Sequence, residues 1–205
     1  MKPLYAVGWL ITRIIATVCF RYRYYHGERV PHTGGVIVAM NHESFLDPNL
    51  AGLACGREIY FLARKSLQKW PIVGYLLPKV NTIYVDQERA DMTAIKTIIR
   101  LVRNGECALI FPEGGRTFDG NLQPAQPGLG LIIAKTLAPV VPMRIFGARA
   151  AMPRGGSGVK FKKVHTVVGE PIRLTEADLV GTKREVYQRL SDRVMEKIAE
   201  LRPVE

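Results

Sequence analysis

Two short polar stretches of this chain hold side chains suited to catalysis, and the first pairs a histidine with a carboxylate. His42 and Asp47 stand five positions apart in the run Asn-His-Glu-Ser-Phe-Leu-Asp-Pro. An imidazole can accept a proton near neutral pH, and a neighbouring carboxylate can fix its tautomer and stabilise the charged ring. Residues on one face of a helix are three or four apart, so a single helix cannot present both side chains.

The elements around this pair are predicted from its neighbours. The apolar residues 35–40 are typical of a buried strand that ends just before Asn41. Asp favours the N-cap of a helix and Pro its first position, so Asp47 and Pro48 predict a helix start. We therefore expect His42 in a strand-to-helix loop that curls back towards Asp47, with Asp47 also capping the helix. From these residues alone, a capping aspartate near an unrelated histidine is the alternative.

The second polar stretch follows another apolar run. Residues 107–111 predict a buried strand, and Pro-Glu-Gly-Gly-Arg-Thr comes next. Gly114 and Gly115 let backbone N–H groups approach an anion, and the planar guanidinium of Arg116 suits phosphate. An ionised Glu113 only accepts hydrogen bonds, so we assign it to positioning, with a structural ion pair as the alternative. Both polar turns are expected at one edge of the sheet, where α/β proteins bind ligands.

The rest of the chain alternates predicted strands and helices. With 205 residues and 47% hydrophobic composition it can bury one substantial core. Further strands are predicted at 58–63, 80–85, 140–146 and 161–168, and helices at 92–103, 128–136 and 182–201, the last with a capping box. This alternation indicates an α/β fold, a single domain with a mostly parallel mixed β-sheet flanked by helices. We place that domain at 26–205, after an N-terminal segment at 1–25.

The N-terminal segment has the composition of a membrane-associated helix. Residues 4–20 are mostly apolar around an interior Arg13, and Arg-Tyr-Arg-Tyr-Tyr follows at 21–25. The run is about the minimum length for a bilayer span, Arg13 penalises full insertion, and basic and aromatic residues favour the interface. We predict a helix lying in the cytoplasmic face of the cell membrane, which makes the protein peripheral or monotopic. A helix packed on the domain is the alternative.

Charge and cysteine content narrow the classes of function. The chain has 29 Lys and Arg against 18 Asp and Glu, a net charge of +11, which attracts polyanions such as membranes and phosphorylated substrates. Nucleic acid is not expected as a partner, because no groove-reading element or RNA-binding aromatic motif is present. Three cysteines without a C-x-x-C pair and four scattered histidines encode neither a disulfide framework nor a zinc site.

Together the two polar stretches resemble the first and third sequence blocks of the glycerolipid acyltransferases, most of all bacterial 1-acyl-sn-glycerol-3-phosphate (lysophosphatidate) acyltransferases. The resemblance covers about residues 35–147 and includes weaker matches at 65–74, 83–86 and 141–142. It implies transfer of a fatty acyl group from acyl-CoA or acyl-carrier-protein thioester to the sn-2 hydroxyl of lysophosphatidate. Acyl carrier protein is then a partner beside the membrane surface expected from the N-terminal segment and the charge, and neither a metal nor a bound cofactor is implied.

The resemblance also implies roles for individual residues. His42 is the general base and Asp47 its partner, while the acceptor hydroxyl is the nucleophile, since a G-x-S-x-G motif around Ser44 is lacking. Arg116 and then Lys65 are the phosphate ligands, with a solvated surface charge as the alternative for each. The remaining assignments are to positioning of the loops: Glu113, Gly114, Gly115 and Asn41. Apolar candidates for the groove of the fatty chain, which core packing explains equally well, are Trp70, Ile72, Val73, Tyr75, Leu76 and Leu77.

Two departures from the family pattern bear on the acceptor. Gly-Gly-Arg-Thr stands where the family usually has Gly-Thr-Arg-Ser, and Gln87 stands where an arginine usually follows the strand, with Arg89 as a substitute two residues along. Other readings therefore remain: acyl transfer to another lysolipid, hydrolysis of an acyl thioester, or a basic membrane-surface module without enzyme activity.

Overall fold

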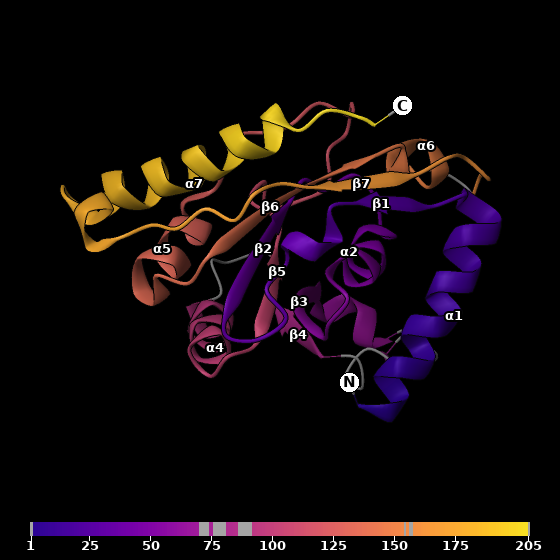
Figure 1. Cartoon of the computed structure of the whole chain (residues 1–205), viewed down its shortest axis with the longest axis horizontal. Helices are drawn as coiled ribbons and strands as arrows, with labels where there is room; N and C mark the ends of the chain where they lie inside the picture. The colour runs from indigo at the N-terminus through magenta and orange to yellow at the C-terminus, as the bar shows by residue number, and fades with distance from the viewer. Residues whose placement is uncertain are drawn as a thin grey trace.

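A mixed sheet with helices on both faces forms the centre of the computed structural model (Figure 1). The structure describes residues 2–69, 74–75, 81–85, 92–153, 155 and 158–204. Within these residues the sheet has the strand order β1-β7-β6-β2-β5-β3-β4, and every neighbouring pair is parallel except β6 and β7. The strands are β1 (Arg23–Tyr25), β2 (Val36–Met40), β3 (Ile59–Arg64), β4 (Thr82–Val85), β5 (Cys107–Ile110), β6 (Val140–Phe146) and β7 (His165–Val168). The predicted α/β class is confirmed.

Helices cover the sheet in two groups. The α-helices are α1 (Pro3–Phe20), α2 (Asp47–Cys55), α4 (Met92–Arg103), α5 (Pro127–Thr136), α6 (Ala148–Ala151) and α7 (Lys183–Glu200), and the short 3-10 helices are η1 (Gly27–Arg29), η2 (Lys65–Lys69) and η4 (Glu176–Leu179). Figure 1 shows α1 and α2 on one side of the sheet and α4, α5 and α7 on the other. Successive residues of β2 face opposite layers, so Val38 joins the core under α2 and Ile37 joins the core under α5 and α7.

The central strands position the two polar turns. Every residue of β2 and β5 is buried, as expected for parallel strands covered on both faces. The parallel register pairs Ala39 with Ile110, so the chain leaves both strands at the same edge of the sheet. Asn41 and Phe111 consequently begin neighbouring loops, which is the arrangement the sequence predicted.

The structure differs from the sequence prediction at two elements, one predicted too long and one not predicted. The strand expected at 161–168 is limited to β7, because its partner β6 ends at Phe146 and Gly147, at φ 83°, turns the chain away into α6. The Arg-Tyr flank contains a strand that the sequence did not predict: β1 pairs with β7 in parallel. The groove candidates Trp70, Ile72, Val73, Leu76 and Leu77, and also Gln87 and Arg89, lie outside the described residues, whereas Tyr75 is described and exposed.

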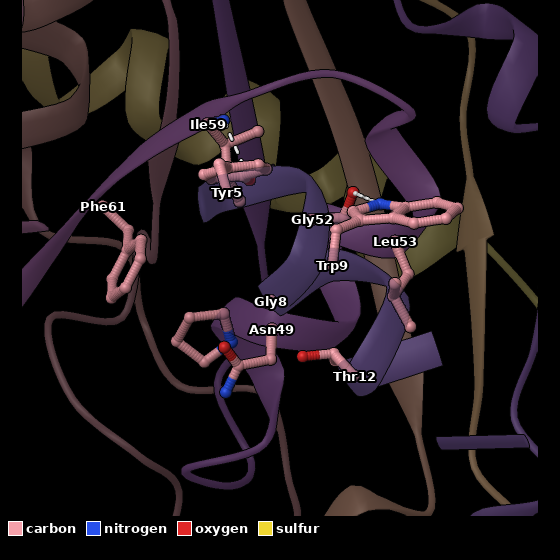
Figure 2. A pocket seen from close by; sticks show the side chains of 10 residues that line it. Tyr5, Gly8, Trp9, Thr12, Asn49, Gly52, Leu53, Ile59 and Phe61 are labelled. Atoms are coloured by element: carbon pink, nitrogen blue, oxygen red, sulfur yellow. Dashed lines mark hydrogen bonds between the residues drawn. The ribbon is translucent and has the colours of Figure 1, made fainter. Parts of the chain in front are cut away.

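Helix α1 packs on the domain with one face. Trp9 Nε1 donates to the carbonyl of Gly52 at 3.2 Å, and the Tyr5 hydroxyl accepts from Ile59 N at 3.2 Å (Figure 2). A small cavity of about 90 Å³ remains between α1 and α2. The other face of α1 is solvent-exposed and apolar, and it consists of Leu4, Val7, Leu10, Ile11, Ile14, Ile15 and Val18. By length and composition, α1 qualifies as a membrane-crossing helix.

Candidate active site

The loop after β2 is folded around the carboxylate of Asp47. His42 Nδ1 lies 2.7 Å from Asp47 Oδ2, and the N–H groups of Glu43 and Ser44 donate to the same oxygen at 2.6 and 2.7 Å. Helix α2 begins at Asp47, one residue earlier than expected. The expected cap is wrong: Asp47 accepts from N–H groups that precede α2. The fully buried carboxylate thus creates the curl that brings His42 back towards it.

The protonation of the pair follows from these contacts. Burial raises the pKa of Asp47, while the hydrogen bonds from His42, Ser44 and Glu43 act in the opposite direction and favour the charged carboxylate. Asp47 Oδ2 accepts a hydrogen bond from His42 Nδ1, so we assign the ring proton of the neutral imidazole to Nδ1. His42 Nε2 is then the nitrogen with a free lone pair, and His42 lines the large cavity described below.

Glu113 joins the two polar turns through backbone groups. Its Oε1 accepts from His42 N at 2.7 Å, and its Oε2 accepts from Gln123 N at 2.9 Å. Burial raises the pKa of Glu113, and these two N–H donors lower it. Thr117 N donates to the carbonyl of His42 at 2.8 Å, which adds a second link between the turns. The position of the imidazole therefore depends on residues from both strand ends.

Asn41 and Ser44 fasten the same loop to β6 and to the residue after α6. The side chain of Asn41 donates to the carbonyl of Ile145 at 3.1 Å and accepts from Ile145 N at 2.8 Å, which continues the strand pairing with a side chain. The buried Ser44 hydroxyl donates to the carbonyl of Met152 at 2.9 Å and accepts from Leu46 N at 3.3 Å. Both contacts hold the loop, and neither directs the Ser44 hydroxyl towards His42.

Two aromatic rings that the sequence analysis did not single out belong to the site. Phe111 stacks on the His42 ring with 3.8 Å between centroids and 15° between planes. The guanidinium of Arg116 lies over the ring of Phe45, 3.7 Å from its centroid. These rings fix the orientation of the base and of the cation by dispersion and cation–π attraction. The available signal was an aromatic residue inside or directly before each polar motif.

A cavity of about 640 Å³ opens over these residues. Its lining includes residues of both polar turns, namely His42, Phe45, Gly114, Gly115 and Arg116. Its apolar part is built mainly from β3, α4, β5 and α5, and it includes Leu62, Leu67, Ile95, Leu109, Leu129 and Ile132. A cavity of this size and composition suits a ligand with a charged head and an apolar chain.

The structure does not bring all the expected ligands together. Lys65 is exposed in η2 and lies outside the lining of the cavity, whereas its neighbour Arg64 is part of that lining. Within the described parts of the chain, the structure has no group of three or more His, Cys, Asp or Glu side chains that could hold a metal ion.

Comparison with known proteins identifies the family. A family model described as Acyltransferase matches residues 21–146, more than half of the chain. The chain belongs to the acyltransferase family. This acyltransferase is 30% identical over 167 residues to the chloroplastic 1-acyl-sn-glycerol-3-phosphate acyltransferase of Brassica napus, a match that covers 80% of the chain and 45% of the relative. The chain thus spans less than half the length of that plant protein.

The matches to a bacterial relative and to a solved structure cover a larger share of those proteins. The 1-acyl-sn-glycerol-3-phosphate acyltransferase of Bacillus subtilis is 29% identical over 181 residues, 86% of each chain. The crystal structure of the 1-acyl-sn-glycerophosphate acyltransferase PlsC from Thermotoga maritima has a TM-score of 0.73 and 24% identity, and it matches 99% of the acyltransferase and 81% of its own chain. The structural match shows the same fold, and the family expected from the sequence blocks is confirmed.

Proposed function

We propose that this acyltransferase moves a fatty acyl group from acyl-CoA or acyl-carrier-protein thioester to the sn-2 hydroxyl of lysophosphatidate, which gives phosphatidate for phospholipid synthesis. The observation that carries the proposal is the His42 and Asp47 pair, 2.7 Å apart, on a cavity that also contains Arg116 and an apolar extension. The names of the plant and Bacillus relatives support lysophosphatidate as the acceptor.

In the proposed reaction, His42 Nε2 takes the proton from the acceptor hydroxyl as that oxygen attacks the thioester carbonyl carbon. The tetrahedral intermediate collapses, the carbon–sulfur bond breaks, and the imidazolium returns the proton to the thiolate. Asp47 stabilises the imidazolium through its hydrogen bond at Nδ1. Ser44 forms no acyl-enzyme in this scheme, because its hydroxyl is buried and bonded to Met152.

Backbone contacts select the donor for the oxyanion of the tetrahedral intermediate. The N–H of His42 donates to Glu113, and the N–H of Gly114 donates to the carbonyl of Phe111 at 3.0 Å. Of the N–H groups of His42, Gly114 and Gly115, only that of Gly115 has no acceptor within the described residues, and Gly115 lines the cavity. We therefore assign oxyanion stabilisation to Gly115.

Arg116 is the proposed ligand of the acceptor phosphate. Its guanidinium is oriented by the Phe45 ring and lines the same cavity as His42. A planar fork of donors binds phosphate oxygens in pairs. Lys65, which is exposed outside the cavity lining, is at most a ligand from the rim, and Arg64 is better placed to assist.

The proposed setting is the cytoplasmic face of the membrane. The exposed apolar face of α1 would lie among the lipids, while the α/β body carries the chemistry. This arrangement supplies a membrane-borne lysolipid acceptor and admits a water-soluble acyl carrier from the cytoplasm.

A panel of acceptors tests the proposal. Thiol release from acyl-CoA is measured with lysophosphatidate, with phosphate-free monoacylglycerol and without acceptor. We expect release to require an acceptor and to favour lysophosphatidate. Arg116→Ala should lower kcat/KM for lysophosphatidate by about 10- to 100-fold, the value of a hydrogen bond to a charged group, and leave monoacylglycerol nearly unchanged. Arg100→Ala on the exposed face of α4 is the matched control.

Two results would contradict the proposal. Acceptor-independent thiol release at the same rate would make the protein a thioesterase. An equal loss on both acceptors in Arg116→Ala would remove the phosphate contact from Arg116.

A further inference from the structure

The segment 158–163, between α6 and β7, exposes apolar and basic side chains together. Phe161 is 77% exposed and Val159 is 49% exposed, although both are large apolar residues. Lys160, Lys162 and Lys163 are exposed between and beside them. The proposed reaction uses none of these residues. An exposed aromatic ring flanked by lysines is typical of proteins that bind at the membrane–water interface.

Hydrogen bonds fix this segment against the end of α1. Lys160 N donates to the carbonyl of Ala151 at 2.7 Å, and Val164 N donates to the carbonyl of Phe20, the last residue of α1, at 3.0 Å. Figure 1 shows the orange chain before β7 reaching the C-terminal end of α1. The two segments are far apart in the sequence and adjacent in the fold.

The charges of the two segments have one sign. Arg21 and Arg23 are exposed directly after α1. Arg23 N donates to the carbonyl of Val164 at 3.3 Å, and Val164 directly follows the last of the three lysines of residues 158–163. The sequence contains no Asp or Glu in residues 1–27 or 147–169. The exposed apolar face of α1 ends at Val18, near this cationic zone. The combined surface is apolar along α1 and positively charged at its C-terminal end.

We propose that residues 158–163 form a second membrane contact, in which Phe161 and Val159 enter the interface and the three lysines bind the phosphate groups of anionic lipids. The proposal extends the proposed membrane association of α1 and rests on it. An acidic protein would match the lysines but not an exposed phenyl ring and an adjoining apolar helix, so a lipid surface fits better. With two contacts the membrane holds the molecule in one orientation.

Vesicle binding tests this contact. Partition of the full-length protein is measured on phosphatidylcholine vesicles and on vesicles that also contain phosphatidylglycerol. Each lysine near an anionic surface contributes about fivefold, so K160Q/K162Q/K163Q should bind phosphatidylglycerol vesicles about 100-fold more weakly and phosphatidylcholine vesicles unchanged. V159S/F161S should bind both about tenfold more weakly. Val180→Ser is the matched control, since Val180 is 74% exposed directly after η4.

Each result supports or overturns the contact. Variants that bind phosphatidylglycerol vesicles as tightly as the control overturn it. Unchanged vesicle binding with a raised KM for acyl carrier protein in the lysine variant would assign the surface to that protein instead. If the unaltered protein does not bind vesicles, membrane association fails for α1 as well. Acyl transfer to detergent-dispersed lysophosphatidate tests the proposed function separately, and all variants should retain it.

Discussion

Replacing Asp47 by Asn tests the proposed role of the carboxylate most directly. One carboxylate oxygen, Oδ2, accepts from His42, Glu43 and Ser44, and the other, Oδ1, is buried without a partner in the described part of the chain. The amide oxygen of Asn can take the place of Oδ2 and keep all three donors. The substitution therefore removes the negative charge while it preserves the shape of the loop and the tautomer of His42.

The magnitude follows from the charge pair that forms during the reaction. With about 4 Å between the centres of charge and an effective dielectric constant of about 20, imidazolium and carboxylate attract by about 4 kcal/mol. Loss of this attraction in the transition state should lower kcat by about 10³-fold. KM for the lysolipid should change little, since Asp47 does not line the cavity.

Steady-state thiol release with lysophosphatidate measures this effect, and Glu43→Gln is the matched carboxylate-to-amide control in the same loop. The NH2 group of the Asn side chain would occupy the site of Oδ1, where it has no acceptor within the described residues. A buried donor without an acceptor should also lower the free energy of unfolding by about 1–3 kcal/mol. Urea unfolding of Asp47→Asn is therefore measured in parallel. A folded Asp47→Asn protein that retains kcat within about threefold would refute the electrostatic role.

Three further predictions concern stability. Burial raises the pKa of Glu43 to about 7 from 4.5, so the folded protein keeps a proton that the unfolded chain releases, and the free energy of unfolding should fall by about 3 kcal/mol as pH rises from 4.5 to about 7. Glu43→Gln should remove this fall in urea titrations at each pH, and an unchanged slope would contradict it. Gly130→Ala would place Cβ 1.8 Å from the carbonyl oxygen of Tyr187, so α5 and α7 should move apart. The free energy of unfolding should fall by about 3 kcal/mol or more. A thermal midpoint equal to the parent's would be inconsistent with this packing. Tyr22→Phe removes the phenol that is hydrogen-bonded to the carbonyl of Leu50 and the hydroxyl of Thr166. The free energy of unfolding, measured by chemical denaturation, should fall by about 1–3 kcal/mol. An unchanged value would show that other groups replace the phenol.

The sequence predicted the elements whose residues are apolar and covered on both faces. The runs that became β2 and β5 end in polar turns, and parallel strands bring such turns to one edge, so the meeting of His42 with the Glu113 turn was predictable. The register of the strands and the three donors on Asp47 were not, because they depend on tertiary contacts.

The errors have local causes. Strand β1 has three residues, Arg-Tyr-Tyr, without an apolar alternation, and only its pairing with β7 makes it a strand. Phe161 has strand propensity but no partner strand beyond Phe146, so it is exposed. Phe111 belongs by its pattern to the core, and its stacking on His42 depends on a loop that folds back.

The joint between α1 and the sheet has a consequence for the proposed membrane setting. Only Arg21, in the left-handed region at φ 46°, and Tyr22 separate α1 from β1, and the Tyr22 phenol is bonded inside the core. No flexible tether intervenes, so a surface that holds α1 also sets the height of His42 above it. A protein held on the membrane by α1 in the proposed way would diffuse in the membrane plane with His42 Nε2 at a constant height above it. It would select acceptors by how deep their hydroxyl lies as well as by their charge.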